Sequence, residues 1–176
     1  PPDPLSAQSR GARRLIDEDR IGRVCFARVR SSHGGPGGAP DGWPFDPTWF
    51  YQPGGGPLFD MGVYGIHEIT SLLGPARRVS AFGGITEAVR TVRGTGPFGG
   101  LRIPVTTPDN FLLMLDFGNS TFAVIDAAFA SRRRGPSPTR TSLCGVSDSA
   151  AWAVRSSGTP LRRKSAPTNK TMGASL

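Results

Sequence analysis

The segment from Leu58 to Leu73 carries the clearest periodic pattern in the chain and most constrains its fold. At about 100° per residue, six apolar side chains collect on one broad face of a helix: Leu58, Met61, Ile66, Ile69, Leu72 and Leu73. Pro57 suits the first helical turn, where its missing N–H costs nothing, and Gly74–Pro75 ends the pattern. The sequence therefore predicts a long amphipathic helix that must bury one face against another layer.

Strand patterns on both sides of this segment supply that layer. Three segments predict strands: Arg23–Ser32, Arg77–Val89, interrupted at Gly83–Gly84, and Asp109–Ala130, a hairpin with its turn at Gly118–Asn119. A short helix and a Gly- and Pro-rich loop are also predicted, at Leu5–Asp19 and His33–Pro47. A long helix with several antiparallel strands indicates an α+β fold in which the helix covers one face of the sheet.

The charge distribution divides the chain into a neutral body and a basic tail. Residues 1–130 hold 12 arginines and 12 acidic residues, so the whole formal excess of +8 lies in residues 131–176. That tail is rich in Ser, Arg and Pro and poor in large apolar groups, which predicts disorder. We therefore expect one domain over residues 1–130 and a disordered tail over residues 131–176. A folded nucleic-acid binder would carry a basic face with stacking aromatics, so no specific nucleic-acid partner is predicted.

Few features indicate a compartment other than the cytoplasm. No stretch approaches the about 18 apolar residues of a membrane span, and the first 20 residues lack the apolar core of a secretory signal. Cys25 and Cys144 are too few for a disulfide framework or a metal knuckle. We expect a cytoplasmic protein, and the lack of an initiator Met suggests a fragment.

The glycine run Gly54–Gly56 in front of the helix invites comparison with phosphate-binding loops. A dinucleotide fingerprint needs G-x-G-x-x-G between a strand and a helix, but Phe59 stands where the third glycine would fall. No Gly-Lys-Ser follows either. The run is therefore predicted to serve close backbone approach or flexibility rather than phosphate binding.

A polar stripe lies opposite the apolar face of the predicted helix. Asp60, Tyr64, His67 and Ser71 follow the spacing i, i+4, i+7, i+11. A carboxylate, a phenol and an imidazole within two turns can move a proton on a hydroxyl substrate. The alternative is that the stripe is only the solvated side of an amphipathic helix. Zinc is not expected, because H-E-x-x-H would need a second histidine at Ser71.

These residues resemble the C-terminal domain of the Gfo/Idh/MocA oxidoreductases, the glucose–fructose oxidoreductase and inositol dehydrogenase family. The shared features are a glycine run, Asp60, Gly62 two residues later, Tyr64 four residues after the Asp, and the helix end "SLLG". "LIDEDRIGRVCFARV" is similar to the family's helix–strand beginning, and "TPDNFLLMLDFGNSTFAVIDAAFA" to its late hairpin. The resemblance covers roughly residues 5–130.

The resemblance implies one half of a two-domain NAD- or NADP-dependent dehydrogenase. It implies an open, mainly antiparallel sheet whose bare face builds a homo-oligomer, and a sugar-like substrate. Asp60 would orient that substrate, Tyr64 would pass a proton where other members have His, and His67 would contact sugar hydroxyls. Gly55 and Gly56 are further candidates for substrate contact.

This chain also departs from the family pattern. It has no G-x-G-x-x-G and no "EKP" stretch, and residues 1–130 contain no lysine. The sequence therefore predicts the substrate domain of a sugar or polyol oxidoreductase, inactive by itself and binding no cofactor alone. The alternative is a non-catalytic dimerisation or sugar-binding module.

Overall fold

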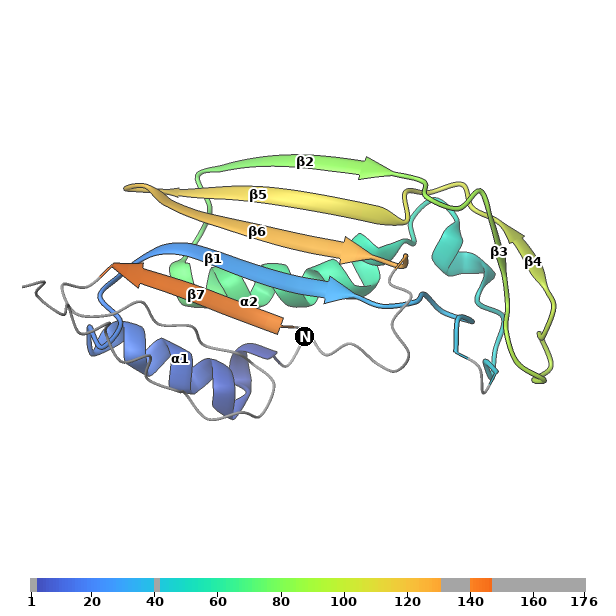
Figure 1. Cartoon of the computed structure of the whole chain (residues 1–176), viewed down its shortest axis with the longest axis horizontal. Coiled ribbons are helices and arrows are strands. Elements are labelled where there is room, and N and C mark those ends of the chain that lie inside the picture. The colour runs from blue at the N-terminus through green and yellow to red at the C-terminus, as the bar shows by residue number, and fades with distance from the viewer. Residues whose placement is uncertain (1–2, 40–41, 131–139, 147–176) are drawn as a thin grey trace, which may run out of the picture.

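A mixed sheet forms the centre of the fold (Figure 1). The computed structural model describes residues 3–39, 42–130 and 140–146. Within them, five strands lie in the order β2–β5–β6–β1–β7: β1 is Arg23–Ser32, β2 is Arg78–Gly84, β5 is Asn110–Gly118, β6 is Thr121–Ala128 and β7 is Arg140–Val146. The β1/β6 pair is parallel, and the other three pairs are antiparallel. The predicted α+β class is confirmed.

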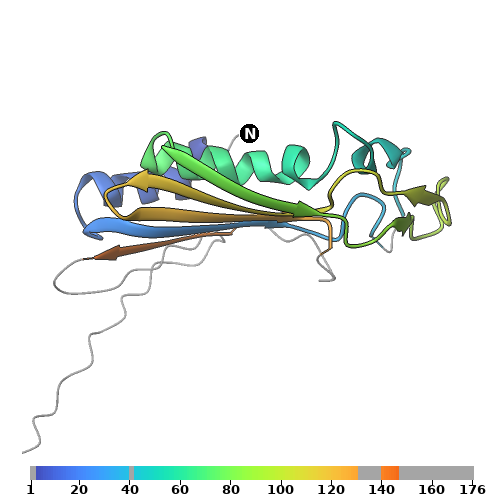
Figure 2. The same ribbon diagram turned by 90° about the horizontal axis from the view of Figure 1, so that it is seen from above.

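Two helices lie on one face of this sheet (Figure 2). Helix α1 is Ala7–Asp17 and begins at Ser6, whose Oγ accepts a hydrogen bond of 3.1 Å from the Ser9 N–H. Helix α2 is Val63–Leu73 and ends at Gly74, where φ is +80°. No described element covers the other face of the sheet.

The prediction of one long α-helix over Leu58–Leu73 is wrong for its first turn. Leu58–Gly62 is a π-helix, and the Val63 N–H donates to the carbonyl of Leu58, five residues back. Over five residues, the apolar pattern cannot distinguish a π turn from an α turn, because one turn is too short for the two periods to separate. The α-helix proper therefore covers 11 residues.

The main core fills the space between the two helices and the sheet. It is built from alternate strand residues and the apolar face of α2: Ala27, Val29, Leu113, Leu115, Ala123, Ile125, Ile69 and Leu72. Gly65 lies where α2 meets β1 and β6, and a Cβ there would come within 3.0 Å of the side chains of Val29 and Ile125. The missing side chain lets α2 lie close to the sheet at this point.

A second, smaller core lies beyond the carboxyl ends of β1 and β6. It joins a 3-10 turn to a two-stranded sheet: the turn is Thr48–Tyr51, β3 is Val89–Thr91 and β4 is Arg102–Pro104. The predicted strand Arg77–Val89 is interrupted, but after Gly84 rather than at Gly83–Gly84, since both glycines pair within β2. The predicted hairpin is also present, but its turn lies at Asn119–Ser120, one residue later than expected, and both residues have the positive φ of a tight two-residue connection.

Part of the segment expected to be disordered is a strand. β7, Arg140–Val146, pairs antiparallel with β1 and buries Leu143 in the main core. The edge of β1 offers unpaired backbone groups, and pairing with them stabilises a segment whose composition alone would not fold. The rest of that segment, residues 131–139 and 147–176, lies outside the described residues.

The close contact at Gly65 gives a stability prediction. In Gly65→Ala, the new methyl group meets Val29, Ile125 and Ser31, all fully buried, and we expect a loss of about 1–3 kcal/mol in the free energy of unfolding. The matched control is Gly11→Ala in α1, where nothing lies within 4 Å. It should gain roughly 0.5–1 kcal/mol through helix propensity. Urea denaturation measures both, and equal stabilisation of the two variants would contradict the packing argument.

Candidate functional site

A cleft lies at the amino-terminal end of the helix that begins with Leu58. It has a volume of about 330 Å³. Three segments line it, namely the 3-10 turn, the glycine run and the first turns of the helix. The lining residues are Trp49, Gly56, Phe59, Asp60, Val63 and Tyr64. Asp60 and Tyr64, both partly buried, are the two polar side chains of this lining. The cleft therefore combines apolar walls with a carboxylate and a phenol.

The glycine run bends back on the 3-10 turn. The N–H groups of Gly55 and Gly56 donate to the carbonyls of Gln52, at 2.9 Å, and Phe50, at 2.7 Å. Amides that are already bonded within the loop do not form an anion-binding nest. The run also follows a 3-10 turn rather than a parallel strand, so the described residues do not fit the pyrophosphate of a dinucleotide.

Glycine is required in this run because of close backbone contact. A Cβ on Gly55 would overlap with the carbonyl oxygen of Trp49 and lie 2.9 Å from that of Phe50. Gly56 has φ +89° and faces the carbonyl of Pro108. Both glycines are buried, but Gly56 is part of the cleft lining and Gly55 is not. Of the two candidate substrate-contacting glycines, only Gly56 therefore reaches the cleft surface.

His33 holds the carboxylate of Asp60 from the end of β1. Its Nε2 lies 3.4 Å from Asp60 Oδ2, and its Nδ1 accepts a hydrogen bond of 2.9 Å from the Gly35 N–H. A neutral ring that accepts at Nδ1 carries its proton on Nε2 and can donate it to the carboxylate. The ring also packs against buried Phe129, with the centroids 5.2 Å apart. Asp60 is therefore oriented by a histidine 27 residues earlier in the chain.

The predicted polar stripe divides into two parts. Asp60 and Tyr64 line the cleft, but His67 is exposed one turn further along α2 and does not line it. The Ser71 Oγ donates to the carbonyl of Glu68, and Ser71 borders a different hollow, between α1 and α2. Spacing along a helix shows which side chains share a face, but the cleft extends over only the first two turns.

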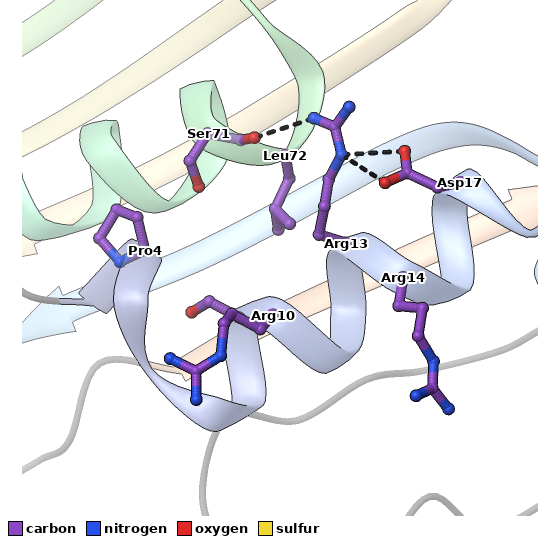
Figure 3. A pocket seen from close by; sticks show the side chains of 8 residues that line it. Pro4, Arg10, Arg13, Arg14, Asp17, Ser71 and Leu72 are labelled. Carbon is purple, nitrogen blue, oxygen red and sulfur yellow. Dashed lines mark hydrogen bonds and ion pairs between the residues drawn. The ribbon is translucent and has the colours of Figure 1, made fainter.

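The hollow between α1 and α2 is part of the contact between these two helices (Figure 3). Arg13 reaches from α1 to the carbonyl of Ser71 at 3.2 Å and also pairs with Asp17 at 2.9 Å. Arg10 donates to the carbonyl of Leu5, and Arg14 pairs with Glu18. The arginines around this hollow are thus engaged within the protein, and we do not assign it a ligand.

A buried ion pair holds the second core against the main sheet. Asp109, whose side chain is 1% exposed, accepts from the backbone N–H of Thr86 at 2.6 Å, from its Oγ1 and from Arg90 Nη2 at 2.9 Å. Burial raises the pKa of Asp109, but the hydrogen bonds from Thr86 and Arg90 together hold it below its usual value. Arg90 in turn lies over the ring of Tyr51, 5.8 Å from its centroid.

Tyr51 connects this ion pair to the cleft. Burial raises the pKa of its phenol to about 12, so the hydroxyl stays protonated and donates to the Pro36 carbonyl at 2.7 Å. The turn that carries Tyr51 also carries Trp49 of the cleft. The buried pair therefore supports one wall of the candidate site.

The part of the chain that the structure describes shows neither a membrane span nor a metal-binding cluster. There, no helix is both long and apolar enough to cross a membrane. Nor does that part of the chain bring three or more His, Cys, Asp or Glu side chains together in a group that could hold a metal ion.

Solved structures share this fold. An NAD-binding oxidoreductase from Klebsiella pneumoniae is 20% identical over 84% of this chain and 37% of its own, with a TM-score of 0.63. Levoglucosan dehydrogenase in complex with NADH and L-sorbose is 20% identical over 84% of this chain and 38% of its own, with a TM-score of 0.64. A super-repressor mutant of Gal80p from Saccharomyces cerevisiae is 17% identical over 86% of this chain and 38% of its own, with a TM-score of 0.61. This chain thus spans less than two fifths of their length.

The fold described here is thus one that also occurs as a part of longer proteins. The sequence profile described as the GFO/IDH/MocA C-terminal domain matches residues 9–150. The chain therefore belongs to the Gfo/Idh/MocA family, and the resemblance seen in the sequence is confirmed. The matched region extends past Ala130 and includes β7. No curated protein matches this chain by sequence.

Three residues of the site were missed in the sequence. His33 falls in the predicted loop His33–Pro47 and is not among the predicted site residues, and neither are Trp49 and Phe59. The position of His33 directly after a predicted strand was a usable signal, since strand ends often carry functional groups. For Trp49 and Phe59, aromatic identity alone does not distinguish a core residue from an exposed one.

The buried ion pair gives a pH-dependent prediction. Asp109→Asn should lose about 3–5 kcal/mol of unfolding free energy at pH 7, because Arg90 is left buried without its carboxylate. Since the folded-state pKa of Asp109 is lowered, its contribution is complete above the unfolded value of about 3.9 and is lost as the pH falls through the folded pKa. The difference between wild type and variant should therefore shrink below about pH 4.

The matched control removes the other carboxylate beside Arg90. Glu87→Gln changes an ion pair of 3.4 Å in which the glutamate is 41% exposed, and we expect a loss below about 1 kcal/mol. Denaturant unfolding of all three proteins from pH 7 to pH 3 measures this. A pH-independent difference for Asp109→Asn would show that its ionisation does not contribute to stability.

Proposed function

We propose that this chain is the substrate-binding domain of an NAD- or NADP-dependent oxidoreductase that acts on a CH–OH group of a sugar or polyol. The observation that carries the proposal is the presence of Asp60 and Tyr64 in one cleft at the head of the helix. The family resemblance assigns catalysis to these two positions. The L-sorbose complex of levoglucosan dehydrogenase supports a sugar-like substrate.

In this proposal Asp60 and Tyr64 have different roles. The carboxylate of Asp60, held by His33, accepts a hydrogen bond from a substrate hydroxyl and orients it. The phenol of Tyr64 relays the proton that leaves the reacting hydroxyl. His67 lies one turn further along α2 and contacts the part of a larger sugar that extends beyond Tyr64.

The nicotinamide cofactor is proposed to be held outside the residues described here. The amides of Gly55 and Gly56 are bonded within their own loop and the sheet is mainly antiparallel, so these residues do not fit a dinucleotide. The relatives are more than twice as long as this chain. The choice between NAD and NADP belongs to that other part of the enzyme. A cytoplasmic location remains a prediction from the sequence.

A non-catalytic binding or dimerisation module is the second candidate. The observation that favours it is the similarity of a Gal80p super-repressor mutant, whose TM-score is close to those of the oxidoreductases. Because all these matches lie near 20% identity or below, they show the fold and do not distinguish a repressor-like module from an enzyme domain.

Two measurements separate these functions. Calorimetric titration of the isolated chain with NADH and NADPH should show negligible binding, because the Gly55 and Gly56 amides in front of the helix are already bonded and cannot meet the pyrophosphate. When the chain is combined with the nucleotide-binding domain of a relative, Tyr64→Phe should lower turnover by about 10²- to 10⁴-fold if the phenol relays a proton. Micromolar cofactor binding by the chain alone would contradict the first expectation, and an unchanged turnover would remove Tyr64 from the mechanism.

We also propose that the bare face of the sheet forms a homo-oligomer. Exposed apolar side chains from four adjacent strands share this face because they are in register or two residues apart: Phe26, Phe82, Leu112, Met114 and Phe122. The ion pairs Arg78–Asp116 and Arg28–Asp126 lie among them. A contiguous apolar patch with charged groups near it is typical of a protein–protein interface.

Sedimentation velocity tests this interface. Phe122→Asp places a charge on the patch and should shift the oligomer to monomer, since an unpaired carboxylate would be buried in the contact. Leu5→Asp, at a residue that is 74% exposed and lies next to α1, should leave the assembly unchanged. A monomeric wild type, or an oligomer that tolerates Phe122→Asp, would contradict the proposal.

A further inference from the structure

We propose that Trp49 and Phe59 form two aromatic walls that select the ring form of a sugar over an open-chain polyol. This inference rests on the proposed function of the same cleft and deepens it, because it names the substrate class. Both side chains line the cleft, and they are 57% and 65% exposed. Large aromatic surfaces left in water beside a carboxylate and a phenol are typical of a ligand site.

The indole of Trp49 is held in place before any ligand binds. One face stacks on the ring of Phe50, with centroids 3.8 Å apart and planes inclined by 29°. Phe50 is buried and makes edge contacts with Trp43 and Phe129 in the second core. Because the indole is already ordered by this stacking, a ligand in the cleft would contact it at little further cost in side-chain entropy.

The glycine run Gly54–Gly56 also fixes the backbone of Trp49. Gly55 lies directly against the carbonyl of Trp49, and the Gly56 N–H donates to the carbonyl of Phe50. The same run then leads through Pro57 into the π-helix that carries Phe59 and Asp60. The two aromatic walls and the carboxylate are thus joined by one short, tightly packed segment.

This arrangement matches the chemistry of a cyclic sugar. A pyranose or furanose ring has faces of C–H groups, which pack on aromatic rings, and hydroxyls around its edge, which need hydrogen-bond partners. Trp49 and Phe59 offer apolar surface, and Asp60 and Tyr64 offer polar groups. An open-chain polyol presents no continuous C–H face, so it would gain the hydrogen bonds without the stacking. The cleft, at about 330 Å³, is at the small end of ligand sites, as a monosaccharide requires.

Matched pairs of ligands test this selection on the full chain. The probes are the methyl glycopyranosides of glucose, galactose and mannose, which are locked as rings, and the alditols of the same configuration, glucitol, galactitol and mannitol. Binding is followed by NMR, through the shift of the Trp49 indole N–H, assigned with Trp49→Phe, and through saturation transfer to the carbon-bound sugar protons. At least one glycoside should bind about tenfold more tightly than its alditol, the order expected from one apolar ring face.

Three variants locate the effect. Trp49→Ala and Phe59→Ala should each weaken binding of that glycoside by about tenfold and leave binding of the alditol unchanged. The matched control is Phe45→Ala, which removes a ring that is 50% exposed and is not part of the cleft lining, and it should have no effect. Phe59 is more exposed than Trp49, so its removal should disturb the fold less. If one variant does not fold, the other still tests the selection.

The outcomes separate this inference from the function on which it rests. Equal binding of glycosides and alditols, or glycoside binding that survives both aromatic substitutions, would overturn the aromatic selection and leave the sugar-binding function intact. If the wild-type chain binds neither class of carbohydrate at high millimolar concentration, the sugar-binding function fails and the inference fails with it.

Discussion

The close contact between the head of the helix and the sheet is the constraint on which the site depends. At Gly62 and Gly65 the backbone lies so near to Ala127, Ile125 and Val29 that a Cβ would touch their side chains. Those strand residues are fully buried and cannot move away. The helix is therefore held in one position, and the side chains of its first two turns, Asp60 and Tyr64, project from a rigid base.

The cleft lies where two separately packed cores meet. The main core fixes the helix, and the second core fixes the turn that carries Trp49. Asp109 joins them, since its backbone N–H donates to Gly84, its carbonyl accepts from Phe129 and its side chain holds Arg90. A site built across such a junction gains one aromatic wall, Trp49, from the second core, while Phe59 and the polar groups come from the helix. The π-helix at this point also agrees with the tendency of π turns to occur at functional sites.

Most of the local structure followed from the sequence because it depends on neighbouring residues. The alternation in Arg23–Ser32, the turn near Asn119 and the stop at Gly74–Pro75 each reflect short-range chemistry, and each has its counterpart in the structure. β7 could not be predicted in the same way. Its composition resembles a disordered segment, and it is a strand because the edge of β1 pairs with its backbone.

The site was predictable only in part for the same reason. Asp60 and Tyr64 are four residues apart on one helix, so their shared cleft followed from spacing. His33 and Asp60 meet although 27 residues separate them, because the parallel pairing of β1 with β6 brings the end of β1 to the head of the helix. The sequence by itself determined the elements, the amphipathic helix and the family pattern, all of which depend on local spacing. The orientation of Asp60 and the stacking of Trp49 were decided only by tertiary packing, because they need contacts between distant segments.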